Sequence, residues 1–95
     1  MGIAKSIIIK VTNRLKKIGY EIKRSHGYQH STAFVKAPNG AWVYISADDD
    51  FERLLVRTAE HERDFTGGTN NFVPVDLHGN NFSKALTLID RLSNR

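Results

Sequence analysis

Residues 31–46, STAFVKAPNGAWVYIS, predict a β-hairpin that decides the rest of the fold. Pro38-Asn39-Gly40 is a turn sequence, because proline presets φ at the first central position and Asn and Gly tolerate the conformations that follow. The flanking segments, residues 31–37 and 41–46, are rich in β-forming side chains. We therefore expect these segments to be neighbouring antiparallel strands.

The second strand of this hairpin carries large side chains on both of its faces. Side chains alternate between the two faces of a strand, so Trp42 and Tyr44 share one face and Val43 and Ile45 share the other. A strand of this kind is expected at the centre of a sheet with both faces covered. A further strand is predicted on the N-terminal side, where alternation with period two begins at Tyr20.

Amphipathic helices are predicted at both ends of the chain. Residues 3–18 place apolar side chains at helical spacing, and Gly19 supplies the stop. The stripe of this first helix consists of Ile3, Ile7, Val11, Leu15 and Ile18. A closing helix is expected after a cap at Asn80 or Asn81, and its stripe consists of Phe82, Ala85, Leu86, Ile89 and Leu92.

Residues 48–62 fit both a helix and a strand. Helical spacing relates Phe51, Leu54, Leu55, Thr58 and Ala59, and Asp49 with Glu52 has the pattern of a capping box. A strand is indicated by the alternation of Leu54, Val56 and Thr58 with Arg53, Leu55 and Arg57. The helical interpretation is slightly favoured. After a turn at residues 66–71, residues 72–77 predict a short strand that Pro74 confines to an edge or a bulge.

These elements predict an α+β fold in one domain over residues 1–95, with the order αβββ, then α or β, then βα. The N- and C-terminal helices should flank a small antiparallel sheet and cover one of its faces. No internal repeat or linker interrupts the pattern.

The composition excludes several classes of chemistry. The chain has no cysteine, so it forms no disulfide and no thiolate metal site, and a reducing, cytoplasmic location is the simplest expectation. No apolar run approaches the ~20 residues of a membrane helix. The four histidines are not at metal-ligand spacing, and we expect no metal, no cofactor and no membrane partner.

Charge is distributed unevenly along the chain. Residues 1–47 contain eight Lys or Arg and one acidic residue, a net charge of +7, whereas residues 48–95 have a net charge of −3. Such segregation is expected when one surface of a protein meets a polyanion. Mutual neutralisation of the two halves is the alternative explanation.

The basic half suggests a nucleic-acid interface, with RNA as the favoured partner. One side of the first helix carries cations at i, i+4 and i+7, and the loop after the first strand mixes cations, imidazoles and an aromatic ring. The expected contacts are Lys10, Arg14, Lys17, Lys23, Arg24, His26 and Tyr28. In the simpler alternative, this loop is an exposed polar turn.

The order of elements and two short motifs resemble the HicA family of messenger-RNA interferases, which have a fold like the double-stranded-RNA-binding domain. The motifs are Gly19-Tyr20-Glu21-Ile22 and Gly27-Tyr28-Gln29-His30, and a looser match covers residues 73–80. By this resemblance the protein would be a toxin–antitoxin ribonuclease, and His30 would take the place of the family's catalytic histidine as general acid and base. Tyr28 replaces the small Ser that is usual in the family.

A second candidate site is a partner-binding loop that combines arginines with small polar residues. Consecutive glycines can form an anion-binding nest, although they are more often a simple turn. The residues of this loop site are Arg57, Thr66, Gly67, Gly68 and Asn70.

The alternative function is a protein-binding accessory or phage-type inhibitor module that acts on a nucleic-acid enzyme. It would present the acidic residues Asp48, Asp49, Asp50 and Glu52 to a basic partner and anchor on Trp42, Tyr44 or Phe65.

Overall fold

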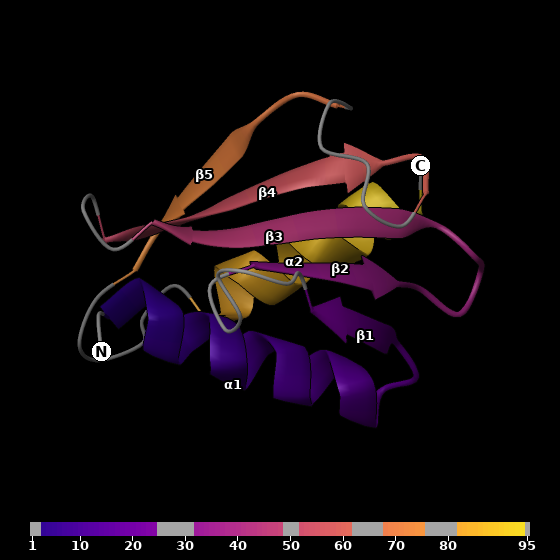
Figure 1. Ribbon diagram of the computed structural model, residues 1–95, viewed down its shortest axis with the longest axis horizontal. Coiled ribbons are helices and arrows are strands. Elements are labelled where there is room, and N and C mark those ends of the chain that lie inside the picture. Colours follow the sequence, from indigo (N-terminus) through magenta and orange to yellow (C-terminus); the bar gives the residue numbers. More distant parts are fainter. Residues whose placement is uncertain (1–2, 25–31, 49–51, 62–67, 76–81, 95) are drawn as a thin grey trace.

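A computed structural model describes residues 3–24, 32–48, 52–61, 68–75 and 82–94, and it forms one antiparallel sheet with two helices (Figure 1). The strands follow one another in the sheet in chain order, β1-β2-β3-β4-β5. The elements are α1 (Ile3–Lys17), β1 (Glu21–Arg24), β2 (Thr32–Lys36), β3 (Trp42–Asp48), β4 (Arg53–Ala59), β5 (Asn71–Pro74) and α2 (Phe82–Ser93).

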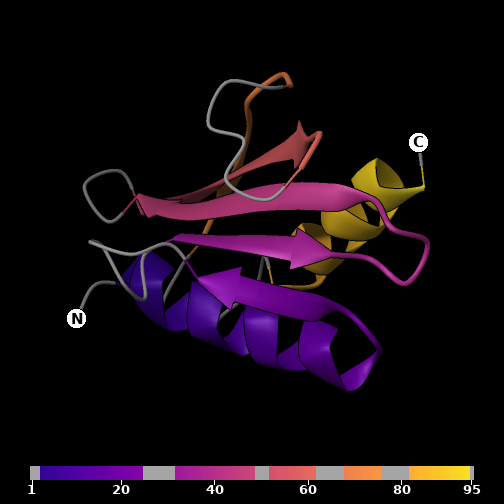
Figure 2. The ribbon, with the colours of Figure 1, turned by 45° about the vertical axis from the view of Figure 1, so that its right-hand side comes forward.

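The predicted hairpin and the α+β class are confirmed. Strands β2 and β3 pair antiparallel from Thr32 with Ser46 to Lys36 with Trp42, and β3 occupies the middle of the sheet. Pro74 ends β5, which lies at one edge, as expected for a residue that has no backbone N–H. Both helices pack on the same face of the sheet, and the described residues place no helix on its other face (Figure 2).

The favoured helical interpretation of residues 48–62 is wrong, because residues 53–59 form strand β4. Leu54 and Val56 are fully buried among the core side chains, and β4 pairs along its length with β3 and over four residues with β5. The alternation of apolar and polar side chains was therefore the correct signal. The expected cap at Asp49 lies outside the described residues, and Glu52 has a positive φ of 49° instead of beginning a helix.

Helix α1 ends at the predicted glycine. Gly19 has a φ of +105°, and the bonds from the N–H of Gly19 to the carbonyl of Lys16 (3.3 Å) and from Tyr20 to Leu15 (3.0 Å) are those of a Schellman motif. Ile18 departs from the predicted apolar stripe, since 54% of its surface is exposed. Beyond the end of the helix, Ile18 no longer follows the helical period, and the fully buried Ile8 contributes to the core instead.

The core lies between the two helices and the sheet. Tyr20, which follows α1, donates a hydrogen bond of 3.1 Å to the Ser93 hydroxyl at the end of α2, and Ser93 donates to the carbonyl of Ile89. These buried hydrogen bonds join the segment that follows α1 to the C-terminal end of α2. The largest fully buried side chains on the helices and on the face toward them include Ile8, Val11, Leu15, Val35, Val43, Ile45, Leu54, Val56 and Ile89.

Candidate nucleic-acid interface

The face of the sheet away from the helices, which we call the open face, carries aromatic and basic side chains. Strand register places opposite residues of neighbouring strands on the same face. Val35 and Val43 pair with each other and point into the helical core, so their neighbours Phe34 and Tyr44, which also pair, point to the open face.

One row of four side chains crosses the open face from β1 to β4. The register pairs Lys23 with Phe34, Phe34 with Tyr44, and Tyr44 with Arg57, so a cation stands at each end and two rings in the middle. The ring centroids of Phe34 and Tyr44 are 4.8 Å apart and inclined at 49°. The Arg57 guanidinium lies 4.4 Å from the centroid of the Tyr44 ring, the geometry of a cation–π contact.

Two further cations of the open face lie over aromatic rings. The Lys36 ammonium is 5.8 Å from the Trp42 ring, its direct cross-strand neighbour, and the Arg53 guanidinium is 3.8 Å from the Phe72 ring. With Arg57 over Tyr44, three rings on two strands, β3 and β5, each have a basic partner. The open face thus repeats one combination of flat aromatic surface and positive charge.

These side chains differ in how far they reach solvent. Phe34 and Arg57 are buried, with 1% and 5% of their surface exposed, and the Arg57 side chain also donates a 3.2 Å hydrogen bond to the carbonyl of Thr58. Trp42 and Tyr44 are half-buried, and Phe72 is 46% exposed. Phe34 and Arg57 therefore support a layer whose accessible part is aromatic.

The electrostatic balance of the open face is positive. The strand register places four cations, Lys23, Lys36, Arg53 and Arg57, and two acidic residues, Glu21 and Asp48, at positions of the open face. Glu21 pairs with Lys23 at 3.2 Å, but both side chains are about half exposed, where an ion pair contributes little. Half-buried rings beside cations provide what unpaired bases and phosphates require, namely stacking surfaces and charge.

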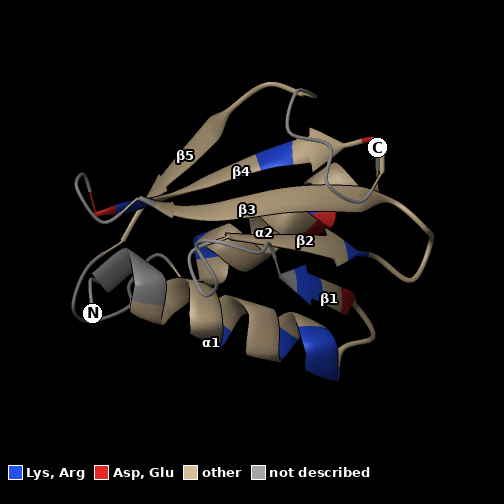
Figure 3. Ribbon diagram, viewed as in Figure 1, with Lys and Arg blue, Asp and Glu red and all other residues tan. Residues whose placement is uncertain are grey.

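The basic stripe of α1 lies elsewhere. Lys10, Arg14 and Lys17 are exposed on one side of the helix, and Arg14 lines a shallow cavity with Leu86 and Asp90 of α2. Arg14 therefore lies beside α2, in the helical layer of the molecule, whereas the register places Lys23 on the open face. Figure 3 shows Lys and Arg positions on both α1 and β1. Among the described residues, the expected continuous surface of helix and hairpin is therefore divided between two faces.

The predicted hairpin-loop site is described only at its beginning. Lys23 lies on β1, and the backbone of Arg24 pairs with that of Ala33. The predicted contacts His26 and Tyr28, and the proposed catalytic residue His30, lie outside the described residues.

The predicted partner-binding loop is also described in part. Thr66 and Gly67 lie outside the described residues, Asn70 is exposed, and Arg57 is buried in the open-face row. Gly68 has a φ of +76°, and a Cβ at this position would lie 2.5 Å from the hydroxyl of Thr58. Close packing on β4 therefore gives a structural reason for this glycine.

The cation–ring pairs of Lys36 with Trp42 and of Arg53 with Phe72 were not predicted from the sequence. The register between β3 and β4 could have predicted a pair of this kind. A strand over residues 53–59 that pairs with residues 42–48 places Arg57 opposite Tyr44. Within the described ranges, no group of His, Asp or Glu side chains is arranged to hold a metal ion. No helix of that same part of the chain is long and apolar enough to span a membrane.

Comparisons with models of protein families, with curated proteins and with solved structures found no match to this chain. The function is therefore inferred from the geometry and charge of the open face.

Proposed function

We propose that this protein binds single-stranded RNA on the open face of its sheet. The observation that carries the proposal is the set of three cation-over-ring pairs, Lys36 with Trp42, Arg57 with Tyr44 and Arg53 with Phe72. Every base has a π-face, so the rings that reach solvent, Trp42, Tyr44 and Phe72, accept bases. The cations that reach solvent, Lys23, Lys36 and Arg53, neutralise phosphates.

The spacing of the rings suits unpaired nucleotides. Trp42 and Tyr44 lie two residues apart on β3 and project from the same face, which separates them by about 7 Å. Each ring can then receive one of two neighbouring bases that have been pulled apart. A duplex keeps its bases stacked inside, so this surface favours single strands, and RNA is the nucleic acid whose loops and ends are commonly read in this way.

The positive balance of the open face supports RNA over a protein partner. Lys23 and Lys36 lie at the β1 and β2 end of the face and Arg53 at the β4 and β5 end, so cations flank the rings on both sides. The α1 stripe, on the helical layer, contributes only to the long-range attraction of a polyanion in this proposal.

The test compares two pairs of substitutions that remove the same charge from different faces. Binding of a fluorescein-labelled single-stranded RNA is measured by anisotropy against salt for the wild type, for Lys23→Gln with Lys36→Gln, and for Lys10→Gln with Lys17→Gln. All four lysines have at least partly exposed side chains, so the variants should fold.

We expect the open-face pair to weaken binding about tenfold or more and to reduce the slope of log affinity against log salt by about 1.4, since each phosphate contact on a single strand contributes about 0.7. The α1 pair should change affinity by less than about threefold. A larger loss of affinity in the variant Lys10→Gln with Lys17→Gln would place the RNA on the helices. Equal binding by all three proteins would contradict an electrostatic interface on the open face and on α1 alike.

A further inference from the structure

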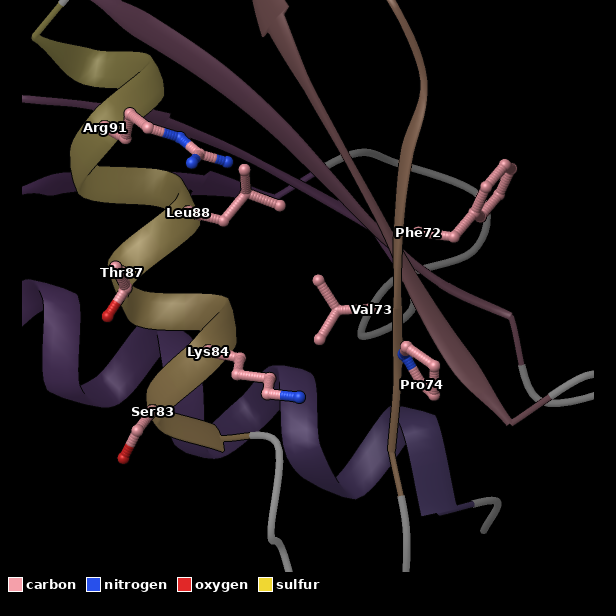
Figure 4. Close-up of a pocket in the computed structure, with 8 residues that line it drawn as sticks. All are labelled: Phe72, Val73, Pro74, Ser83, Lys84, Thr87, Leu88 and Arg91. Carbon is pink, nitrogen blue, oxygen red and sulfur yellow. The ribbon is translucent and has the colours of Figure 1, made fainter.

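A second surface, at the β5 edge of the sheet, has the properties of a peptide-binding groove. It lies between β5 and α2, has a volume of about 500 Å³, and is lined by Phe72, Val73, Pro74, Ser83, Lys84, Thr87, Leu88 and Arg91 (Figure 4). Val73 and Leu88, which are nearly buried, point toward each other across the groove. The floor is therefore apolar.

Two cations flank this apolar floor. Lys84, Leu88 and Arg91 are at i, i+4 and i+7 on α2, and Figure 4 shows the Lys84 and Arg91 side chains reaching from the helix toward β5 on either side of Leu88. None of the described residues of the lining is acidic. A ligand with negative charge at both ends and an apolar centre complements this arrangement.

The edge of β5 offers backbone groups beside the groove. The N–H of Val75 donates to the carbonyl of Glu52. In an antiparallel pair, every second residue of a strand forms backbone hydrogen bonds with its neighbour. The residues of this segment that bond to β4 in this way are therefore Val75, Val73 and Asn71. The N–H and C=O of Phe72 consequently point away from β4. Within the described part of the chain, β5 pairs with β4 alone, so an added strand would lie along its outer edge.

We infer that this groove binds an extended acidic peptide of the pattern acidic, any, apolar, any, acidic. The peptide lies between β5 and α2 as an added strand, with its central apolar side chain over Val73 and Leu88. Seven residues of helix separate Lys84 from Arg91 by about 10 Å, and side chains four apart on a strand are separated by about 13 Å. The long side chains of both cations span the difference.

The experiment uses a labelled peptide, Thr-Glu-Thr-Val-Thr-Glu-Thr with blocked ends, and the same peptide with lysine at both glutamate positions. Affinity is measured by fluorescence anisotropy, and contacts by the change in amide chemical shifts of the intact protein. The variants are Lys84→Gln with Arg91→Gln, and, as a matched control with the same loss of charge, Lys16→Gln with Lys17→Gln, which are exposed on α1.

We expect the acidic peptide to shift the amide signals of Phe72, Val73 and Leu88. Its affinity should fall at least tenfold for Lys84→Gln with Arg91→Gln. The affinity should fall less than twofold for the control, Lys16→Gln with Lys17→Gln. The variant Lys84→Glu with Arg91→Glu should bind the lysine peptide in preference to the acidic one. This exchange of specificity requires direct contact and does not depend on stability.

The inference would be overturned if the wild type bound both peptides equally. It would also be overturned if the Phe72 and Val73 signals did not change at saturating peptide, or if the protein formed a dimer that buries the groove and excludes the peptide. Phe72 borders both surfaces, but the RNA assay varies Lys23 and Lys36, neither of which lines the groove, so failure of either proposal leaves the other measurable.

Discussion

At the scale of single residues, glycines show where the backbone itself is constrained. Gly68 and Gly40 both have positive φ, 76° and 91°, in which a side chain is strained. They differ in surroundings, because a Cβ at Gly68 would meet the Thr58 hydroxyl at 2.5 Å and the Thr58 carbonyl at 2.7 Å, while a Cβ at Gly40 would meet nothing within 4 Å. A comparison of substitutions at Gly40 and Gly68 therefore separates the loss of stability due to backbone strain from the loss due to steric overlap.

We expect Gly40→Ala to lower the free energy of unfolding by about 1 kcal/mol through strain alone, and Gly68→Ala to lower it by about 2 to 4 kcal/mol. Urea unfolding of the two variants measures the difference. Equal losses would mean that residue 68 does not pack on β4.

At the scale of elements, β4 shows why the sequence was ambiguous and how the structure decides between the two interpretations. The run Leu54, Leu55, Val56 satisfies helical and strand periods alike, and only pairing with β3 and β5 selects the strand. The helices, the hairpin and the edge position of β5 were predictable, because each depends on local periodicity or on proline. The cation–ring pairs were not, since Arg53 and Arg57 reach their rings only through cross-strand register.

The strand assignment predicts opposite results for two identical substitutions. Leu54 points into the core and is fully buried, while Leu55 is half-buried on the open face. Leu54→Ala should cost about 2 to 5 kcal/mol of unfolding free energy and Leu55→Ala less than about 1.5 kcal/mol. Thermal or urea unfolding tests this prediction, and a similar loss at both positions would argue against a two-faced strand.

At the scale of the whole molecule, the described basic residues of the first half of the chain lie on two faces rather than on one continuous surface. The basic residues 1–47 fold into α1 and the first three strands, which place Lys10, Arg14 and Lys17 on the helical layer and Lys23 and Lys36 on the open face. Arg53 and Arg57, from the acidic half of the sequence, join the second group. Register across the sheet, rather than position in the chain, therefore assembles the proposed RNA interface.

The measurement that tests this account most directly uses Trp42, the one tryptophan of the chain, which lies in the proposed interface. Its fluorescence is followed as an eight-nucleotide single-stranded RNA is added, with an abasic oligonucleotide of equal charge as the control. We predict saturable quenching by the RNA, weaker as salt is raised, with a slope of about −2 for three phosphate contacts. The abasic chain should leave the emission nearly unchanged. Unaltered Trp42 fluorescence with RNA at low salt, or equal quenching by both oligonucleotides, would contradict base stacking on the open face.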